Sequence, residues 1–209
     1  MKTILYHYVH CPFCLRVRFA LGYLELDYVS KVLPYSDEKT PVELTGEKML
    51  PILSWKGLAH NESLDIIKLI DDENKLNWSL VNNDLEILLS KLGKDIHSLA
   101  MPYWIYTPEF SEKDRLYFKE KKEAKRGPFK KLVKEQNIFL ENLSITLNEL
   151  EKKIHPFYQS ESLTLADIMI ASHLWGLYNV CEFQFSPALH SYLQTIKKIC
   201  YFNYHQDYV

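Results

Sequence analysis

The chain has 209 residues, of which 47% are hydrophobic and 25% charged, a balance typical of a globular protein with one large or two small domains. Its formal net charge of −2 gives no general reason to expect nucleic-acid or membrane binding. The N-terminal apolar stretch is too short for a signal peptide, and no run approaches the ~18 residues that cross a bilayer, so we expect a cytoplasmic protein.

The first third of the chain alternates between strand and helix patterns. An aromatic and β-branched run comes first, and apolar residues at helical spacing follow it as far as Gly22. After Gly22, a short segment has the residue alternation of a strand. Strand, helix and strand at this spacing form a βαβ unit, so the two strands should be parallel. The predicted elements are a strand over 3–9, a helix over 15–23, a strand over 28–33, a hairpin over 52–55 and 58–60, and a helix over 62–70. This order is the thioredoxin-like arrangement.

Helical periodicity dominates the rest of the chain. Apolar residues recur every three or four positions over 84–99 and 137–154, and a third helix is predicted over 165–180. The sequence therefore predicts an α/β thioredoxin-like N-terminal domain followed by an all-α C-terminal domain. We place these domains at 1–73 and 83–209, with a linker at 74–82.

Two cysteines, Cys11 and Cys14, are spaced C-x-x-C where the first strand ends and a helix begins. Pro12 suits the first turn of a helix, where its missing N–H would be unpaired in any case. Cys11 should then lie at the positive end of the helix, which favours the thiolate and makes Cys11 the attacking sulfur. Cys14, one turn further along, would be the resolving thiol. Arg16 and Arg18 would add positive potential, although we expect one of the two to be solvated.

A metal site is the alternative reading of this segment. His7 and His10 precede the cysteines, which gives four possible ligands. Structural zinc usually takes a second ligand pair from elsewhere in the chain, and ligands divided between a strand and a helix start suit a tetrahedral site poorly. We therefore expect no metal and a dithiol site.

Three motifs in the first third of the chain form a recognisable set. They are His10-Cys11-Pro12-Phe13-Cys14-Leu15-Arg16, Gly46-Glu47-Lys48-Met49-Leu50-Pro51-Ile52-Leu53 and Asn61-Glu62-Ser63-Leu64-Asp65-Ile66. Together they resemble the glutaredoxin 2 family, atypical bacterial glutaredoxins built like a glutathione S-transferase. The resemblance covers essentially the whole chain. The sequence departs from the family pattern at Phe13, where tyrosine is usual, and at Asn61, where proline often precedes the Glu-Ser pair.

The resemblance implies that glutathione is a cosubstrate, bound in a cradle beside Cys11. It implies a cis Leu50–Pro51 bond, and it assigns the γ-glutamyl group to Glu62 and Ser63 and the glycyl carboxylate to Lys48. Without the cysteine pair, Pro51 would read as an ordinary trans proline, Glu62-Ser63 as a helix cap, and Lys48 as an exposed lysine. The expected ligand-binding residues are Cys11, Phe13, Lys48, Leu50, Pro51, Glu62 and Ser63.

The helical half carries fewer chemical signals. Thr164 and Asp167 form a T-x-x-D capping pattern, so Asp167 is interpreted as structural. Cys181 and Cys200 lie in apolar helical sequence and are expected to be buried and inert. Residues 113–134 carry ten basic and three acidic side chains. This is typical of a solvated helical face, and it could also attract glutathione or acidic proteins.

We therefore expect a glutathione-dependent thiol–disulfide oxidoreductase that reduces glutathionylated and disulfide-containing proteins through Cys11 and Cys14. One alternative is a glutathione transferase in which Tyr6 or Tyr8 activates glutathione. A second alternative is a non-enzymatic glutathione-binding protein whose helical domain recognises a partner. The cysteine pair argues against the transferase, because conjugation needs neither thiol.

Overall fold

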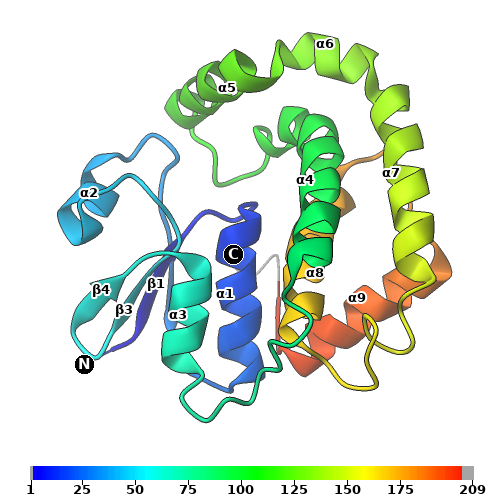
Figure 1. Cartoon of the computed structure of the whole chain (residues 1–209). Helices are drawn as coiled ribbons and strands as arrows, with labels where there is room; N and C mark the ends of the chain where they lie inside the picture. The colour runs from blue at the N-terminus through cyan, green and yellow to red at the C-terminus, as the bar shows by residue number, and fades with distance from the viewer. Residues whose placement is uncertain (1, 204–209) are drawn as a thin grey trace. The chain divides into compact units, whose positions relative to one another are not determined.

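The N-terminal part of the chain builds a four-stranded mixed sheet (Figure 1). The structure, a computed structural model, describes residues 2–203. β1 (Ile4–His7) pairs in parallel with β2 (Val29–Val32) and antiparallel with β3 (Ile52–Trp55), which pairs with β4 (Leu58–His60). The sheet order is β2-β1-β3-β4. The predicted parallel pair and the predicted hairpin are both confirmed.

Three helices accompany this sheet. α1 (Pro12–Tyr23) and α3 (Ser63–Ile70), both predicted as helices, contact each other on one face of the sheet (Figure 1). The short α2 (Lys39–Thr45), which contacts β3 and β4, was not predicted from the sequence. A local signal precedes it, because the carboxylate of Asp37 accepts a hydrogen bond from the Thr40 N–H at 3.0 Å, as a helix-capping residue does.

Two glycines occupy positions where a residue with a side chain would be strained or would clash. Lys56 and Gly57 turn the β3–β4 hairpin with φ of 50° and 90°, the pair of left-handed residues that a two-residue hairpin turn requires. Gly22, expected to stop α1, is the last residue but one of that helix. A Cβ atom on Gly22 would lie 1.8 Å from the carbonyl oxygen of Cys200, so only glycine permits this close approach.

The remainder of the chain is helical. The predicted third helix is shorter than expected, because α8 ends at Leu174 and continues as the tighter 3₁₀ helix η1. α4 contacts α6, α7 and α8, so its apolar stripe forms the centre of this part. The elements are α4 (Asn83–Trp104), α5 (Glu112–Arg126), α6 (Phe129–Lys134), α7 (Gln136–Glu151), α8 (Leu165–Leu174), η1 (Trp175–Asn179) and α9 (Pro187–Ile199).

The predicted capping box begins α8. The Thr164 N–H donates to the carboxylate of Asp167 at 2.8 Å, and the Thr164 hydroxyl donates to the same oxygen. The other oxygen of Asp167 accepts the Tyr158 N–H at 2.7 Å and the Tyr192 hydroxyl at 2.8 Å. Asp167 is completely buried with these donors, so its predicted structural role is confirmed.

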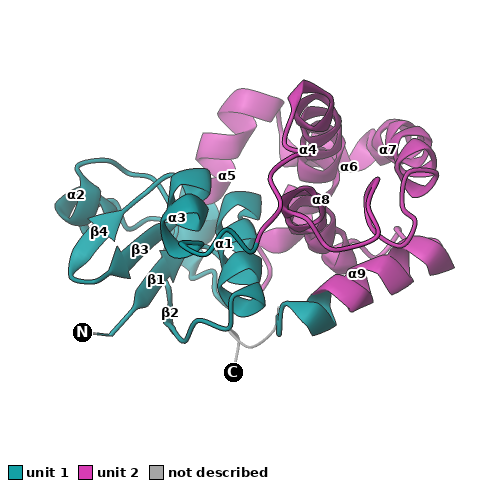
Figure 2. Cartoon of the chain, turned by 60° about the horizontal axis from the view of Figure 1, so that its bottom comes forward, with its two compact units in different colours: residues 1–75, 108–117, 197–209 teal, residues 76–107, 118–196 magenta. Residues whose placement is uncertain are grey.

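The chain forms two compact units (Figure 2). The first contains residues 1–75, 108–117 and 197–209, and the second contains 76–107 and 118–196. Two short segments of the helical half therefore belong to the unit that holds the sheet. The predicted domains, with boundaries at 73 and 83, are continuous in sequence, whereas these units are not, so the predicted boundaries stay a prediction. The last residues of the predicted second domain, 204–209, lie outside the described part.

Within residues 2–203, no helix is both long and apolar enough to cross a bilayer.

Candidate active site

The two cysteines differ in exposure at the start of α1. Cys11 is the N-cap residue, with an extended backbone, and its carbonyl accepts the first helical hydrogen bond from Leu15 at 2.9 Å. Pro12 occupies the first helical position, as predicted. Cys11 is half-buried, whereas Cys14 is completely buried. The less buried cysteine of the pair is therefore the one at the positive end of the helix.

The surroundings of Cys14 keep its proton on the sulfur. Burial raises the pKa of the Cys14 thiol well above its usual range, and the hydrogen bond with Cys11 raises it further. The Tyr8 N–H, 3.4 Å from the Cys14 sulfur, acts in the opposite direction. A protonated Cys14 can donate to the sulfur of Cys11, and this favours the thiolate on Cys11.

Tyr8, whose N–H contacts the Cys14 sulfur, is stacked on Tyr35 with 4.1 Å between ring centroids. Burial raises the pKa of Tyr8, and the neighbouring thiols Cys14 and Cys11 raise it further. Tyr8 therefore remains a neutral phenol at neutral pH.

The predicted cis bond between Leu50 and Pro51 is confirmed. A second cis bond, between His155 and Pro156, had no sequence prediction. Leu50 packs with Cys14, Leu33 and Ile52 in one buried cluster. The structure thus brings the second motif against the buried cysteine.

The third motif meets α1 through an arginine. Ser63 is buried, and its hydroxyl accepts a hydrogen bond from the Arg16 guanidinium at 3.3 Å. The same guanidinium lies 5.0 Å above the exposed ring of Phe13. Glu62, exposed at the start of α3, has a φ of 62°. Phe13, Arg16 and Ser63 therefore line one side of the Cys11 turn.

The expectation that Arg16 or Arg18 would be solvated is wrong, because both side chains are buried. Arg18 donates to the Asn203 carbonyl at 3.0 Å and lies 4.7 Å from the Phe202 ring centroid. The Asn203 carbonyl and the face of the Phe202 ring thus stabilise the buried charge of Arg18.

The expectation for Cys181 is wrong as well. Cys181 is exposed, in a turn after η1 rather than in apolar helical surroundings. Cys200 is buried, as predicted.

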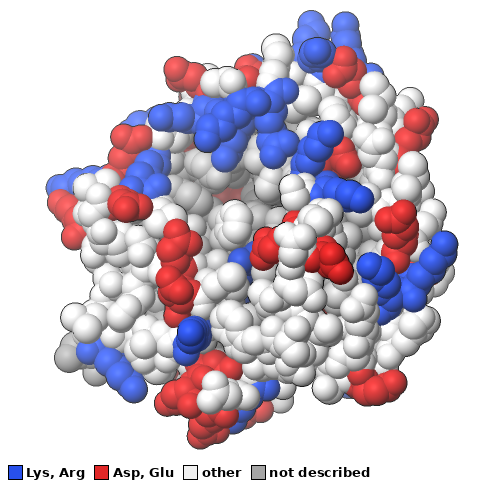
Figure 3. All heavy atoms as spheres, viewed as in Figure 1, with Lys and Arg blue, Asp and Glu red and all other residues white. Residues whose placement is uncertain are grey.

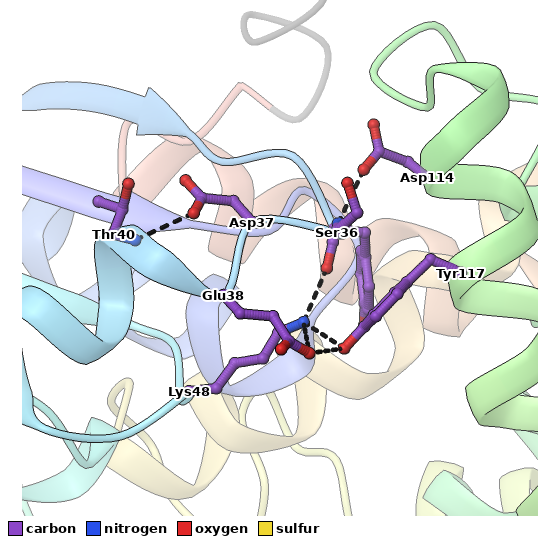
Figure 4. A network of polar contacts seen from close by, with 8 residues as sticks. Ser36, Asp37, Glu38, Thr40, Lys48, Asp114 and Tyr117 are labelled. Atoms are coloured by element: carbon purple, nitrogen blue, oxygen red, sulfur yellow. Dashed lines mark hydrogen bonds and ion pairs between the residues drawn. The ribbon is translucent and has the colours of Figure 1, made fainter.

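Lys48 is held by a polar network (Figure 4). Its ammonium donates to the Tyr35 carbonyl and to the Glu38 carboxylate, each at 3.2 Å, and to the Tyr117 hydroxyl. Tyr117 in turn donates to Glu38. Lys48 is three-quarters buried, so it is not the plain exposed lysine that the alternative reading expected. Its ammonium would have to exchange one of these partners to reach a ligand.

Among residues 2–203, no three His, Cys, Asp or Glu side chains come together as a metal-binding group. Nε2 of His7 lies 2.8 Å from the Ser30 hydroxyl, and Nε2 of His10 lies 2.7 Å from the Glu109 carboxylate. The two histidines thus contact separate partners.

Comparison with known proteins identifies the family. The family model described as "Glutaredoxin 2, C terminal domain" matches residues 65–205, and that of the glutathione S-transferase N-terminal domain matches residues 5–78. The chain belongs to the glutaredoxin 2 family. It is 30% identical to glutaredoxin 2 of Escherichia coli K12 over 201 residues, which cover 93% of this chain and 94% of that protein. As a member of this family, it is a glutathione-dependent thiol–disulfide oxidoreductase.

Solved structures agree with this assignment. The crystal structure of glutaredoxin 2 from Salmonella typhimurium in complex with glutathione matches with a TM-score of 0.88 and 27% identity, over 99% of this chain and 98% of that one. A glutathione transferase from Phanerochaete chrysosporium matches with a TM-score of 0.80, 13% identity and coverage of 97% and 98%. The second likeness concerns the fold alone.

Three residues near the cysteine turn of this glutaredoxin were missed by sequence reasoning. Glu109 and Phe110 come from the segment between α4 and α5, and Tyr117 lies in α5. They contact His10, Tyr35 and Lys48, respectively. They lie almost a hundred residues beyond Cys11 and form no motif with it. Only their placement in the first compact unit reveals them.

Proposed function

We propose that Cys11 is the nucleophile of this glutaredoxin and Cys14 its resolving thiol. The observation that carries this assignment is the contrast between the two sulfurs. Cys11 is half-buried at a helix N-terminus, whereas Cys14 is completely buried and has a raised pKa. Thiol–disulfide exchange needs an accessible thiolate to begin, and Cys11 alone of the pair has that access.

Reduction of a glutathionylated protein then takes two exchanges. The Cys11 thiolate attacks the glutathione sulfur, which forms a Cys11–glutathione disulfide and releases the protein thiolate, protonated by solvent. A second glutathione thiolate attacks the glutathione sulfur on Cys11. Oxidised glutathione leaves, Cys11 returns to the thiolate, and the electron pair has passed from glutathione to the protein.

Reduction of a protein disulfide uses both cysteines. Cys11 attacks one sulfur of the substrate and forms a mixed disulfide. Cys14 then loses its proton and attacks Cys11, which releases the substrate as a dithiol and leaves a Cys11–Cys14 disulfide. Two glutathione molecules reduce that disulfide. The hydrogen bond between the two thiols supports this step, since it places the attacking sulfur next to its target.

We propose that glutathione lies over Cys11, Phe13, Leu50 and Pro51, with its γ-glutamyl group at Glu62 and Ser63 and its glycyl carboxylate towards Lys48. The cis Leu50–Pro51 bond and the buried Ser63 support this cradle. The Arg16 guanidinium behind Ser63 adds positive charge at the end assigned to the γ-glutamyl carboxylate.

We further propose that the substrates are glutathionylated and disulfide-containing proteins and that the protein works in the cytoplasm. The reaction consumes reduced glutathione, which the reducing cytosol supplies.

One experiment tests the activity against its main competitor. The purified chain is assayed for glutathione-coupled reduction of a small mixed disulfide and, in parallel, for conjugation of glutathione to a model electrophile. We expect rapid reduction that depends on Cys11 and little conjugation. Conjugation that persists in Cys11→Ser, without any reduction by the parent protein, would overturn the proposal in favour of a transferase.

A further inference from the structure

A buried contact between a histidine and a carboxylate, which is an ion pair when the histidine is protonated, lies directly beside the proposed nucleophile. Nε2 of His10 is 2.7 Å from Oε1 of Glu109, and their side chains are only 5% and 11% exposed. His10 immediately precedes Cys11, whereas Glu109 comes from the segment between α4 and α5. Both residues belong to the first compact unit.

Aromatic rings enclose this pair. The Phe110 ring stacks on His10 with 6.4 Å between ring centroids and on Tyr35 with 5.5 Å. Tyr35 in turn stacks on Tyr8, the residue whose N–H contacts the Cys14 sulfur. The ion pair therefore closes one end of a row of stacked rings that passes beside both cysteines.

Stability alone is a poor reason for such a pair. Removing two charges from water costs about as much free energy as their attraction returns, so replacing a buried ion pair by apolar residues is often neutral or stabilising. The segment has a second anchor, because the Ser36 N–H donates to the Asp114 carboxylate at 2.8 Å (Figure 4). Glu109 thus places a charge next to the cysteine turn where Asp114 and Phe110 already hold the segment.

We propose that Glu109 is a positioning residue that acts through His10. The ion pair fixes His10 and, with it, the adjoining backbone of Cys11 in its N-cap position on α1. There the unpaired N–H groups of the first helical turn stabilise the Cys11 thiolate. A displacement of about 1 Å in a reacting group can reduce a rate roughly a hundredfold. We therefore expect the restraint on Cys11 to affect its reactivity more than the stability of the fold.

The test measures the reactivity of Cys11 without glutathione. Glu109→Gln keeps the size of the side chain and removes its charge. We expect iodoacetamide to alkylate Cys11 about three- to tenfold more slowly in this variant, since a smaller fraction of Cys11 is then thiolate at a given pH. The reduction potential of the Cys11–Cys14 couple should become more negative, because thiolate stabilisation favours the reduced form. The KM for glutathione should not change, since Glu109 lies outside the proposed cradle.

Two further variants separate this role from loss of structure. Asp114→Asn weakens the second anchor of the same segment, and we expect it to lower the unfolding midpoint while the alkylation rate stays within twofold of the parent. In a His10→Gln background, Glu109→Gln should have no further effect, because its partner is already absent. Equal slowing by Asp114→Asn, or an undiminished effect of Glu109→Gln without His10, would overturn the proposal.

The inference rests on the proposed role of Cys11, yet different results would refute the proposed function and the positioning role. Absence of reductase activity would refute the proposed function and leave the alkylation rates to be compared. An alkylation rate unchanged by Glu109→Gln in a folded protein would refute the positioning role alone.

Discussion

At the scale of single residues, access to solvent separates the two cysteines of one helical turn. Cys14 is enclosed by Leu33, Leu50 and Ile52, and burial raises the pKa of its thiol. Cys11, in the same turn, is only half-buried. In the proposed mechanism, the order of the two steps therefore follows from burial rather than from any difference between the thiols themselves.

Replacement of each cysteine should separate their roles. Cys11→Ser should abolish all reductase activity, because serine forms no mixed disulfide. Cys14→Ser should retain substantial activity on glutathione mixed disulfides, which need one protein sulfur, and lose most activity on protein disulfides, which need a resolving thiol. Parallel assays with both substrates check this. Residual reduction by Cys11→Ser, or a completely inactive Cys14→Ser, would mean that the roles are assigned wrongly.

Ser63→Ala should weaken glutathione binding. The hydroxyl already accepts from Arg16, so its loss removes a contact at the proposed γ-glutamyl site and leaves the buried guanidinium with one acceptor fewer. We expect binding to weaken by about 1–3 kcal/mol, the usual value for a hydrogen bond to a charged group. The KM for glutathione measures this, with Ser79→Ala in the second unit as a control. An unchanged KM would place the carboxylate elsewhere.

At the scale of elements, the sequence predicted the sheet, α1, α3 and the helices with a clear apolar stripe. It failed where another part of the chain determines the outcome. α8 reads as helical to Val180, but the chain tightens into η1 after Leu174. α2 is too short for a periodic signal. The site divides in the same way, because Cys11, Cys14, Leu50, Pro51 and Ser63 lie in motifs, whereas Glu109 has no local pattern.

The close approach at Gly22 should make α1 sensitive to one methyl group. The Cβ of Gly22→Ala would lie 1.8 Å from the Cys200 carbonyl oxygen, which is backbone and cannot rotate away. We expect a loss of about 2–4 kcal/mol in unfolding free energy, in the range for overpacked cores. Denaturant unfolding measures this. Gly93→Ala is the matched control, because its Cβ would meet only side chains, that of His173 at 3.4 Å and that of His97 at 4.0 Å. Equal effects of the two substitutions would contradict the argument.

The helices of the second unit enclose a neutral histidine. Burial lowers the pKa of His97 to about 3, and the nearby His173 and Arg126 lower it further. The Arg126 guanidinium lies 3.3 Å from Nδ1 of His97. In the unfolded chain His97 has a pKa near 6.5, so the unfolded state binds more protons between pH 6.5 and 3. The contribution of His97 to stability is therefore full above pH 6.5 and is lost as the pH falls.

We expect this loss to reach about 1–2 kcal/mol between pH 7 and pH 5. The measurement compares the unfolding free energy of the parent with that of His97→Gln at both pH values. The difference between the two proteins should shrink at pH 5, because glutamine does not titrate. A constant difference would show that His97 titrates in the folded protein as it does in the unfolded chain.

At the scale of the whole molecule, charge is distributed unevenly despite the net value of −2. Lys and Arg side chains gather over α5 and α6 (Figure 3). Residues 113–134 carry ten basic and three acidic side chains, and most of the lysines are exposed. A field of this kind raises the encounter rate with anionic partners at low ionic strength.

Reversal of three of these charges tests the effect. We expect a Lys119→Glu, Lys125→Glu and Lys130→Glu variant to reduce an acidic glutathionylated protein about two- to tenfold more slowly at low salt, and equally well at high salt. The control is Lys68→Glu, Lys91→Glu and Lys152→Glu, which changes the net charge equally. Equal slowing by both sets would show that only the total charge matters.

The unit that holds Cys11 is assembled from three separate stretches of chain, 1–75, 108–117 and 197–209. During synthesis the first stretch emerges from the ribosome long before the other two. Until residue 109 appears, His10 lacks its carboxylate, and until residue 200 appears, α1 lacks the carbonyl packed against Gly22. The catalytic unit therefore cannot be completed while translation is under way in the helical half, although domains more often fold in the order in which they are made.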